Sequence, residues 1–191
     1  MKNIILSDDD FYFKIKKYKN KKYHFFYKLN NKLIDNDKYI SNKLNDIDKE
    51  KIYIIHALNI KDKRLRIIYI YDILCNYLDR DIENNNCCDF KNNKCIAVRC
   101  GYYNKDSNNG CCYGKRRGVC KYISNNKCST SNIACKLFTC KYLRDKNIKY
   151  DINKFNLINI FFNSFQKYII TSSVMIDKDS LIDELVKWSF I

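Results

Sequence analysis

Ten of the eleven cysteines lie between residues 87 and 140, and this cluster constrains the fold more than any other feature. Because eleven is an odd number, the cysteines cannot all pair within one chain. We expect a cytoplasmic protein: the apolar run Ile4–Leu6 ends before Asp8, whereas a secretion signal needs about 7–15 apolar residues. Stable disulfides do not form in that reducing compartment, and soft thiolates are costly to leave unpaired, so the cluster predicts a bound metal.

The cysteines of the cluster repeat one spacing, C-x6-C-x4-C, which begins at Cys88 and again at Cys128. Cys87 is a weaker candidate ligand, because two adjacent cysteines seldom both reach one metal. Cys75 lies upstream on an expected helix and is predicted to be a buried helix cysteine. The predicted metal ligands are Cys88, Cys95, Cys100, Cys111, Cys112, Cys120, Cys128, Cys135 and Cys140.

The absence of histidine between residues 87 and 140 limits which metals the cluster can bind. The only two, His24 and His56, lie far upstream, which leaves four-thiolate zinc or an iron–sulfur cluster. The segment contains no C-x2-C pair of the kind that zinc sites use, and its cations would offset the charge of an anionic cluster. We therefore predict one or two iron–sulfur clusters, first of all [4Fe–4S], with zinc as the alternative. A purely structural role, in which the metal replaces a missing apolar core and takes part in no reaction, is the remaining alternative.

Positive charge is concentrated in the same segment. From Asn86 to Lys146 there are 13 Lys/Arg and 3 Asp/Glu, a net +10 of the chain's +15, which a uniform codon bias would not produce. The alternative function is a zinc-stapled nucleic-acid-binding module, in which cations neutralise phosphates and tyrosines stack on bases. Its candidate residues are Arg99, Lys115, Arg116, Arg117, Lys121, Tyr113 and Tyr122. The predicted partners are thus a nucleic acid or a redox partner protein.

With 46% hydrophobic residues the chain can bury a core, and we predict a single α+β domain over residues 1–191. The predicted segments are a small antiparallel β-meander at 7–35, helices at 48–82, the irregular metal-binding segment at 83–146 and helices at 153–191.

Alternating aromatic residues predict the strands of the meander. Phe11, Phe13 and Ile15 alternate with Tyr12, Lys14 and Lys16, and a second alternation runs from Tyr23 to Leu29. Asn30-Asn31 predicts a tight turn into the next strand, because asparagine tolerates positive φ.

Apolar residues at spacings of three and four predict the helices. One helix is expected at about 48–58 and a clearer one at about 62–82. The apolar face of the second consists of Ile67, Tyr71, Leu74, Leu78 and Ile82.

Further helices are expected at 153–171 and from a cap at Asp177 or Asp179 to about Trp188. Leu181, Leu185 and Trp188 are expected to face the core, with docking of a partner on these helices as the alternative. The apolar side of helix 153–171 consists of Phe155, Ile158, Phe161, Phe162, Phe165 and Ile169.

The runs Cys88–Cys95 and Ala134–Leu143 resemble uncharacterised cysteine-cluster proteins of low-GC anaerobic bacteria, and also the iron- or zinc-chelating cysteine-cluster families. The resemblance covers about residues 66–146. It implies metal binding in a reducing cytoplasm and carries no assigned activity.

Motifs of the common enzyme classes are absent from the sequence. There is no phosphate-binding G-x4-G-K-[ST], no G-x-G-x-x-G, no H-E-x-x-H and no G-x-S-x-G, and no residue is predicted to be catalytic. The most apolar stretch, Leu157–Phe165, is too short for a membrane span, and Asn159 and Asn163 interrupt it.

Overall fold

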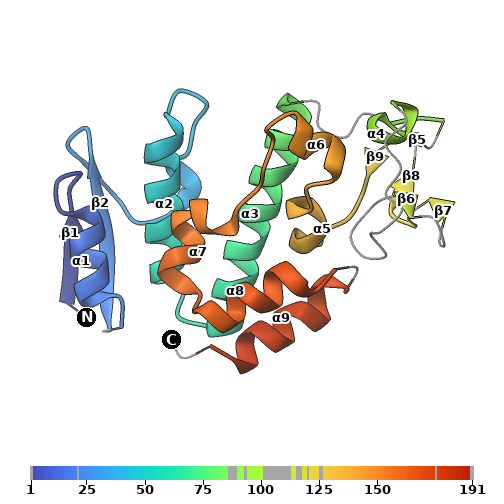
Figure 1. The fold of residues 1–191 in the computed structure, drawn as a ribbon. Coiled ribbons are helices and arrows are strands. Elements are labelled where there is room, and N and C mark those ends of the chain that lie inside the picture. The colour runs from blue at the N-terminus through green and yellow to red at the C-terminus, as the bar shows by residue number, and fades with distance from the viewer. Residues whose placement is uncertain are drawn as a thin grey trace.

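The computed structural model confirms the α+β class, with a small three-stranded sheet at the N-terminus and helices after it (Figure 1). It describes residues 2–20, 22–85, 90–92, 94–100, 113–114, 118–119, 121–124, 127–174 and 176–189.

The sheet contains β1 (Lys2–Leu6), β2 (Tyr23–Leu29) and β3 (Lys32–Ile34) in that order. β1 runs parallel to β2, and β3 runs antiparallel to it. The tight turn between β2 and β3 is confirmed: Asn30 and Asn31 have φ of 48° and 62°, the left-handed values that a two-residue hairpin turn requires.

The predicted antiparallel meander is wrong in its first strand, because residues 11–18 form helix α1 (Phe11–Tyr18). Phe11 and Ile15, four residues apart, are buried, whereas Phe13 is 71% exposed. A parallel pair needs a crossover connection between its strands, and α1 supplies it between β1 and β2. β1 itself was not predicted, since its apolar run is so short.

The two helices expected at 48–82 are confirmed as α2 (Asp46–Asn59) and α3 (Lys63–Asn84). Both begin with a side-chain cap: the oxygens of Asn45 and Asp62 accept backbone N–H groups of the first turn. The predicted apolar face of α3 is buried from Ile67 to Leu78, and Ile82 packs on a separate small cluster.

The helix expected at 153–171 is interrupted. It consists of a 3₁₀ turn η2 (Ile152–Lys154) followed by α7 (Asn156–Phe161) and α8 (Ser164–Ser172). Asn163 and Gln166 form a capping box that starts α8 anew, because each side chain bonds the other's backbone N–H.

The last helix is confirmed as α9 (Lys178–Lys187), and Asp177 is its N-cap. Leu181 and Leu185 are buried as predicted, but Trp188 is 39% exposed and packs its ring edge-on to Phe165, itself 47% exposed. The predictions that Trp188 faces the core and that Phe165 lies on the buried side are therefore wrong.

Short elements occupy the described parts of the cysteine-rich segment. They are β4 (Phe90–Lys91), β5 (Lys94–Cys95), α4 (Ile96–Arg99), β6 (Tyr113–Gly114), β7 (Gly118–Val119), β8 (Ile123–Ser124), β9 (Lys127–Cys128), α5 (Ile133–Leu137) and α6 (Lys141–Asp145). A further 3₁₀ turn, η1 (Asp37–Tyr39), precedes α2.

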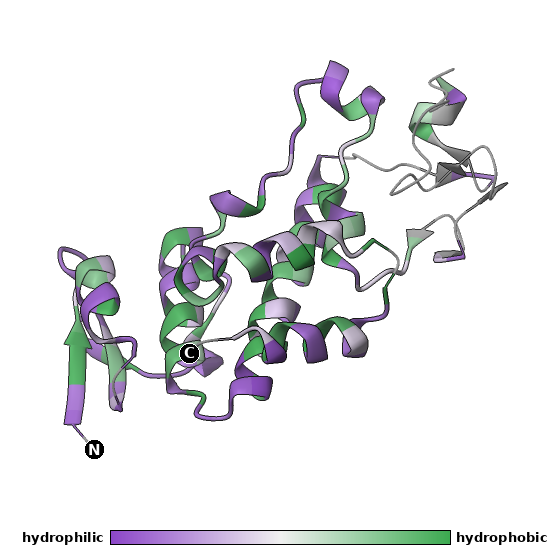
Figure 2. Cartoon of the chain, turned by 60° about the horizontal axis from the view of Figure 1, so that its bottom comes forward, coloured by the Kyte–Doolittle hydropathy of each residue, from purple (hydrophilic) through white to green (hydrophobic). Residues whose placement is uncertain are grey.

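The main core joins the sheet to the helices, with buried side chains from β1, β2, α2, α3, α5 and α7–α9. α2 packs against β2, and α3 packs against α2, α5 and α9. The sheet lies at one end of the molecule in Figure 1, and β5–β9 with α4 lie at the other. Figure 2 shows hydrophobic and hydrophilic residues alternating along the helices, as one buried face per helix requires.

The side chain of Asn59, at the end of α2, bonds the backbone of β2 and of the segment after β3, where the pairing of β2 with β3 has ended. Its side-chain oxygen accepts the N–H of Phe25 at 2.8 Å, and its amide nitrogen donates to the carbonyls of Phe25 and Asp35, both at 2.9 Å. The amide thus takes the place of a strand neighbour at the point where β3 ends.

No helix in the described ranges combines the length and the apolar character that crossing a bilayer requires.

Candidate metal centre in the cysteine-rich segment

Four of the predicted ligands have described side chains. Cys100, directly after α4, and Cys128, in β9, are exposed, whereas Cys135 in α5 and Cys140 at the start of α6 are half-buried. Cys95 ends β5, and only its backbone is described. The predicted ligands outside the described residues are Cys88, Cys111, Cys112 and Cys120, as is the weaker candidate Cys87.

Among the side chains that the structure describes, no three His, Cys, Asp or Glu residues come close enough together to hold a metal ion. The described cysteines therefore do not form a complete site by themselves. The predicted ligand set stays a prediction, because most of its members lie outside the described ranges or have no described side chain.

Two hairpins of this segment share a sequence motif that the spacing analysis missed. Phe90–Cys95 and Ile123–Cys128 both read as an apolar residue, any residue, then Asn-Asn-Lys-Cys. Their register is the same: Phe90 pairs with Cys95, and Ile123 pairs with Cys128. Asn92 has φ of 50°, which explains asparagine in this turn. Each hairpin thus delivers a cysteine at the end of its second strand.

The helices after these hairpins also correspond. α4 and α5 both begin with Ile-Ala, and Ala97 and Ala134 are both buried. The repeated unit is therefore a cysteine hairpin followed by a short helix, and alignment of Asn-Asn-Lys-Cys would have found it from the sequence.

Residues 130–136, which we name the α5 anchor, tie the segment to the helices. Ile133 is fully buried in the main core, and its N–H donates to the Tyr71 hydroxyl of α3 at 3.1 Å. The side chain of Asn132 donates to the carbonyls of Ser173 and Ile176, at 2.6 and 2.9 Å. The anchor thus bonds both α3 and the connection between α8 and α9.

A second, smaller cluster holds α6 and α4 at the end of α3. Its buried residues are Ala97, Tyr142 and Leu143, and Ile82 and Cys140 pack against it. Cys140 thus packs on the same small apolar cluster as Ile82 of α3.

The basic residues of the alternative interpretation are described only in part. Arg99 and Lys121 are exposed, and the Lys121 ammonium lies 4.9 Å from the centre of the Tyr122 ring. Only the backbone of Tyr113 is described. Three cations lie outside the described residues: Lys115, Arg116 and Arg117.

The place of Lys136 in the basic segment suggests a cation that would offset the charge of a cluster. The structure shows another role for this lysine. Its side chain is buried, and its ammonium pairs with Asp79 of α3. Because a buried ammonium needs a charged partner, this lysine serves the docking of α5.

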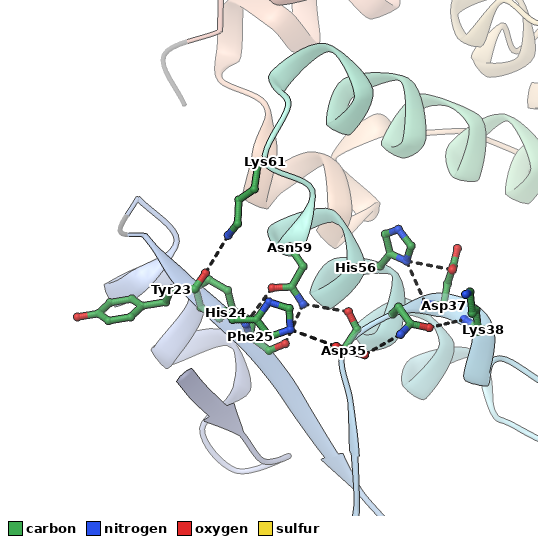
Figure 3. A network of polar contacts seen from close by, with 10 residues as sticks. Tyr23, His24, Phe25, Asp35, Asp37, Lys38, His56, Asn59 and Lys61 are labelled. Carbon is green, nitrogen blue, oxygen red and sulfur yellow. Dashed lines mark hydrogen bonds and ion pairs between the residues drawn. The ribbon is translucent and has the colours of Figure 1, made fainter. Parts of the chain in front are cut away.

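The two histidines lie at the other end of the molecule, in a polar network that joins the sheet, the segment after β3 and α2 (Figure 3). His24 Nε2 is 3.1 Å from Asp35, and His56 Nδ1 accepts the N–H of Asp37 at 3.0 Å. The ring of His56 also stacks on Tyr69. Both histidines thus contact the segment that leads from β3 to α2, and they have structural partners there.

Cys75 is expected to be unreactive in the native protein. It is 6% exposed, its thiol donates to the Ser131 carbonyl at 3.3 Å, and burial raises its pKa to about 12 from 9.0. At neutral pH the thiolate fraction then falls by on the order of a thousandfold. Timed maleimide labelling with mass spectrometry should find Cys75 modified at least this much more slowly in native than in urea-unfolded protein; equal rates would contradict its burial.

Comparison with known proteins found no match to any protein family, curated protein or solved structure.

Proposed function

We propose that residues 87–140 bind a metal centre through cysteine thiolates alone, in a cytoplasmic protein, with an iron–sulfur cluster as the first candidate and zinc as the second. The observation that supports this most is the contrast between many cysteines and little apolar core. Ten cysteines lie in the segment, whereas the second cluster contains three buried apolar residues in its described part.

The described ladders of the segment are too short to be stable on their own. β4–β5, β6–β7 and β8–β9 each pair only two residues per strand. An isolated two-stranded hairpin is marginal in water even when it is longer. Metal–thiolate bonds would cross-link such hairpins and would replace the missing core, as they do in small metal-stapled domains.

The cysteine-only donor set supports the choice of metals. The histidines contact Asp35, Asp37 and Tyr69 at the opposite end of the molecule, so they are poor candidates for ligands. All-thiolate sites hold zinc or iron–sulfur clusters, and the wide cysteine spacing favours one or two [4Fe–4S] clusters. Such a cluster would serve electron transfer with a redox partner protein, sensing, or structure alone.

Anaerobic purification with elemental analysis and absorption and EPR spectroscopy tests the proposal. An iron–sulfur protein is expected to be brown, to contain iron and sulfide, and to bleach in air. A colourless protein with stoichiometric zinc selects the second candidate. Metal-free protein with its cysteines paired as disulfides would reject thiolate ligation altogether.

A matched pair of variants separates ligation from a general loss of folding. Cys128→Ser changes an exposed predicted ligand in β9, and Cys75→Ser changes a buried cysteine outside the predicted set. We expect Cys128→Ser to lose bound metal and Cys75→Ser to keep it. The opposite pattern would refute the assignment of Cys128.

Nucleic-acid binding by a zinc-stapled segment is the second candidate function. The net charge of +10 between residues 86 and 146 supports it, as does the exposed Lys121, whose ammonium lies over the Tyr122 ring. Affinity for single-stranded RNA or DNA should then fall steeply with salt, because binding releases condensed counterions. No binding at low salt in a fluorescence titration would end this candidate.

A further inference from the structure

The α5 anchor contains the buried residue that joins the described part of the cysteine-rich segment to the main core, Ile133. Thr130, Asn132, Ile133, Ala134 and Lys136 are each at most 7% exposed. This short stretch is framed by predicted ligands: Cys128 precedes it, Cys135 lies within it and Cys140 follows it closely.

Contacts of the anchor with α3 hold its backbone in place. The Tyr71 hydroxyl accepts the N–H of Ile133, and the Cys75 thiol donates to the Ser131 carbonyl. The ion pair of Lys136 with Asp79 adds a third contact to the same helix. The position of Cys135 therefore depends on the docking of α5 against α3.

Contacts of the anchor with the α8–α9 connection go through one side chain. Asn132 donates to the carbonyls of Ser173 and Ile176, and its own oxygen caps α5 by accepting the N–H of Cys135 at 2.9 Å. A single amide therefore links the backbone of the predicted ligand Cys135 to the connection between α8 and α9.

We infer that the α5 anchor couples the metal state of the cysteine segment to the stability of α8 and α9, an inference that rests on the proposed metal binding. Metal held by Cys128, Cys135 or Cys140 stabilises the docked anchor, and the docked anchor holds the α8–α9 connection. Coupling free energy is reciprocal, so loss of metal loosens these helices. The stability of α8 and α9 then depends on whether the metal is bound.

Hydrogen exchange of the full chain, with and without metal, tests the coupling. The protein is compared as purified and after chelation, with its metal content measured in each sample. We expect α9 amides to exchange about a hundredfold more slowly with metal, as for any ligand at about 100 times its Kd. The only tryptophan, Trp188, gives a second readout, because its fluorescence follows unfolding of the α8–α9 pair.

Two asparagine caps provide the variants. Asn132→Ala removes the link to Ser173 and Ile176, and Asn45→Ala removes the cap of α2, a helix that does not contact the α5 anchor through any bond described above. We expect both variants to keep the metal. The effect of metal on α9 should persist in Asn45→Ala and should fall at least about tenfold in Asn132→Ala.

The outcomes separate this inference from the proposed function. Metal-bound wild-type protein whose α9 exchange equals that of the stripped protein overturns the coupling and leaves metal binding standing. An undiminished effect in Asn132→Ala also overturns it. Protein that never binds metal ends both proposals. If Asn132→Ala does not fold, the wild-type comparison alone decides.

Discussion

Between pH 9 and pH 12 the protein is expected to lose most of its stability and to unfold cooperatively. Burial raises the pKa of the Cys75 thiol to about 12, and it also raises the pKa values of Tyr27, Tyr69 and Tyr71 above the ordinary 10.0. These groups stay protonated in the folded protein and ionise on unfolding. The folded state therefore binds more protons, and its stability falls as pH rises.

The size of the alkaline effect follows from the number of such groups. Each adds about 1.4 kcal/mol of destabilisation per pH unit above its unfolded pKa. Cys75 alone contributes about 4 kcal/mol by pH 12, against a typical total of about 5–15 kcal/mol, and the tyrosines add to this above pH 10. Lys19 and Arg66 act in the opposite direction, since burial lowers their pKa values. Burial also raises the pKa values of Tyr12 and Tyr77, so the groups that destabilise the folded state at high pH outnumber these two.

Urea unfolding at a series of pH values, with tyrosinate absorbance as a second signal, measures the alkaline effect. Tyr71 is fully buried and Tyr168 is 66% exposed, so Tyr71→Phe and Tyr168→Phe are a matched pair. We expect Tyr71→Phe to make the loss of stability with pH less steep and Tyr168→Phe to leave it unchanged. Constant stability up to pH 12 would show that these hydroxyls and the thiol reach solvent.

Replacement of Ile133 by alanine is expected to cost about 2–5 kcal/mol of unfolding free energy. Ile133 is fully buried and belongs to the main core, although it lies in the five-residue helix α5 of the cysteine-rich segment. The substitution leaves a cavity that α3 and α8, which both pack on α5, cannot easily fill. Urea denaturation of the two proteins at neutral pH measures the difference.

Leu65→Ala is the control for this prediction, because Leu65 lies on α3 and is 59% exposed. Its effect should stay within about 0.5 kcal/mol. An equally small effect of Ile133→Ala would mean that α5 is not docked, and the inferred coupling through the α5 anchor would lose its basis.

The long helices could be predicted from the sequence because their signals are local. The face from Ile67 to Leu78 follows the helical period, and Asp177 begins α9 with a side-chain cap. Asn30 and Asn31 likewise mark the hairpin, since few other residues tolerate positive φ. The break between α7 and α8 also has a local cause, the Asn163–Gln166 capping box, which the apolar period concealed.

At the candidate site the sequence identified the cysteines but not how the segment is held. Lys136 reads as one more surface cation, and only the docking of α5 against α3 shows that it pairs with Asp79. The correspondence of the Asn-Asn-Lys-Cys hairpins was present in the sequence and became visible when their registers proved the same.

The sequence by itself determined the helices α2, α3 and α9, the Asn30-Asn31 hairpin and the concentration of thiols and charge, because periodicity, caps and turn residues act over a few neighbours. Only the tertiary structure decided that residues 11–18 form a helix, because Phe11 and Ile15 fit both a strand and a helix. The parallel pairing of β1 with β2, a contact between distant segments, selects the helix as the crossover. Distant contacts likewise decided that the α5 anchor belongs to the core.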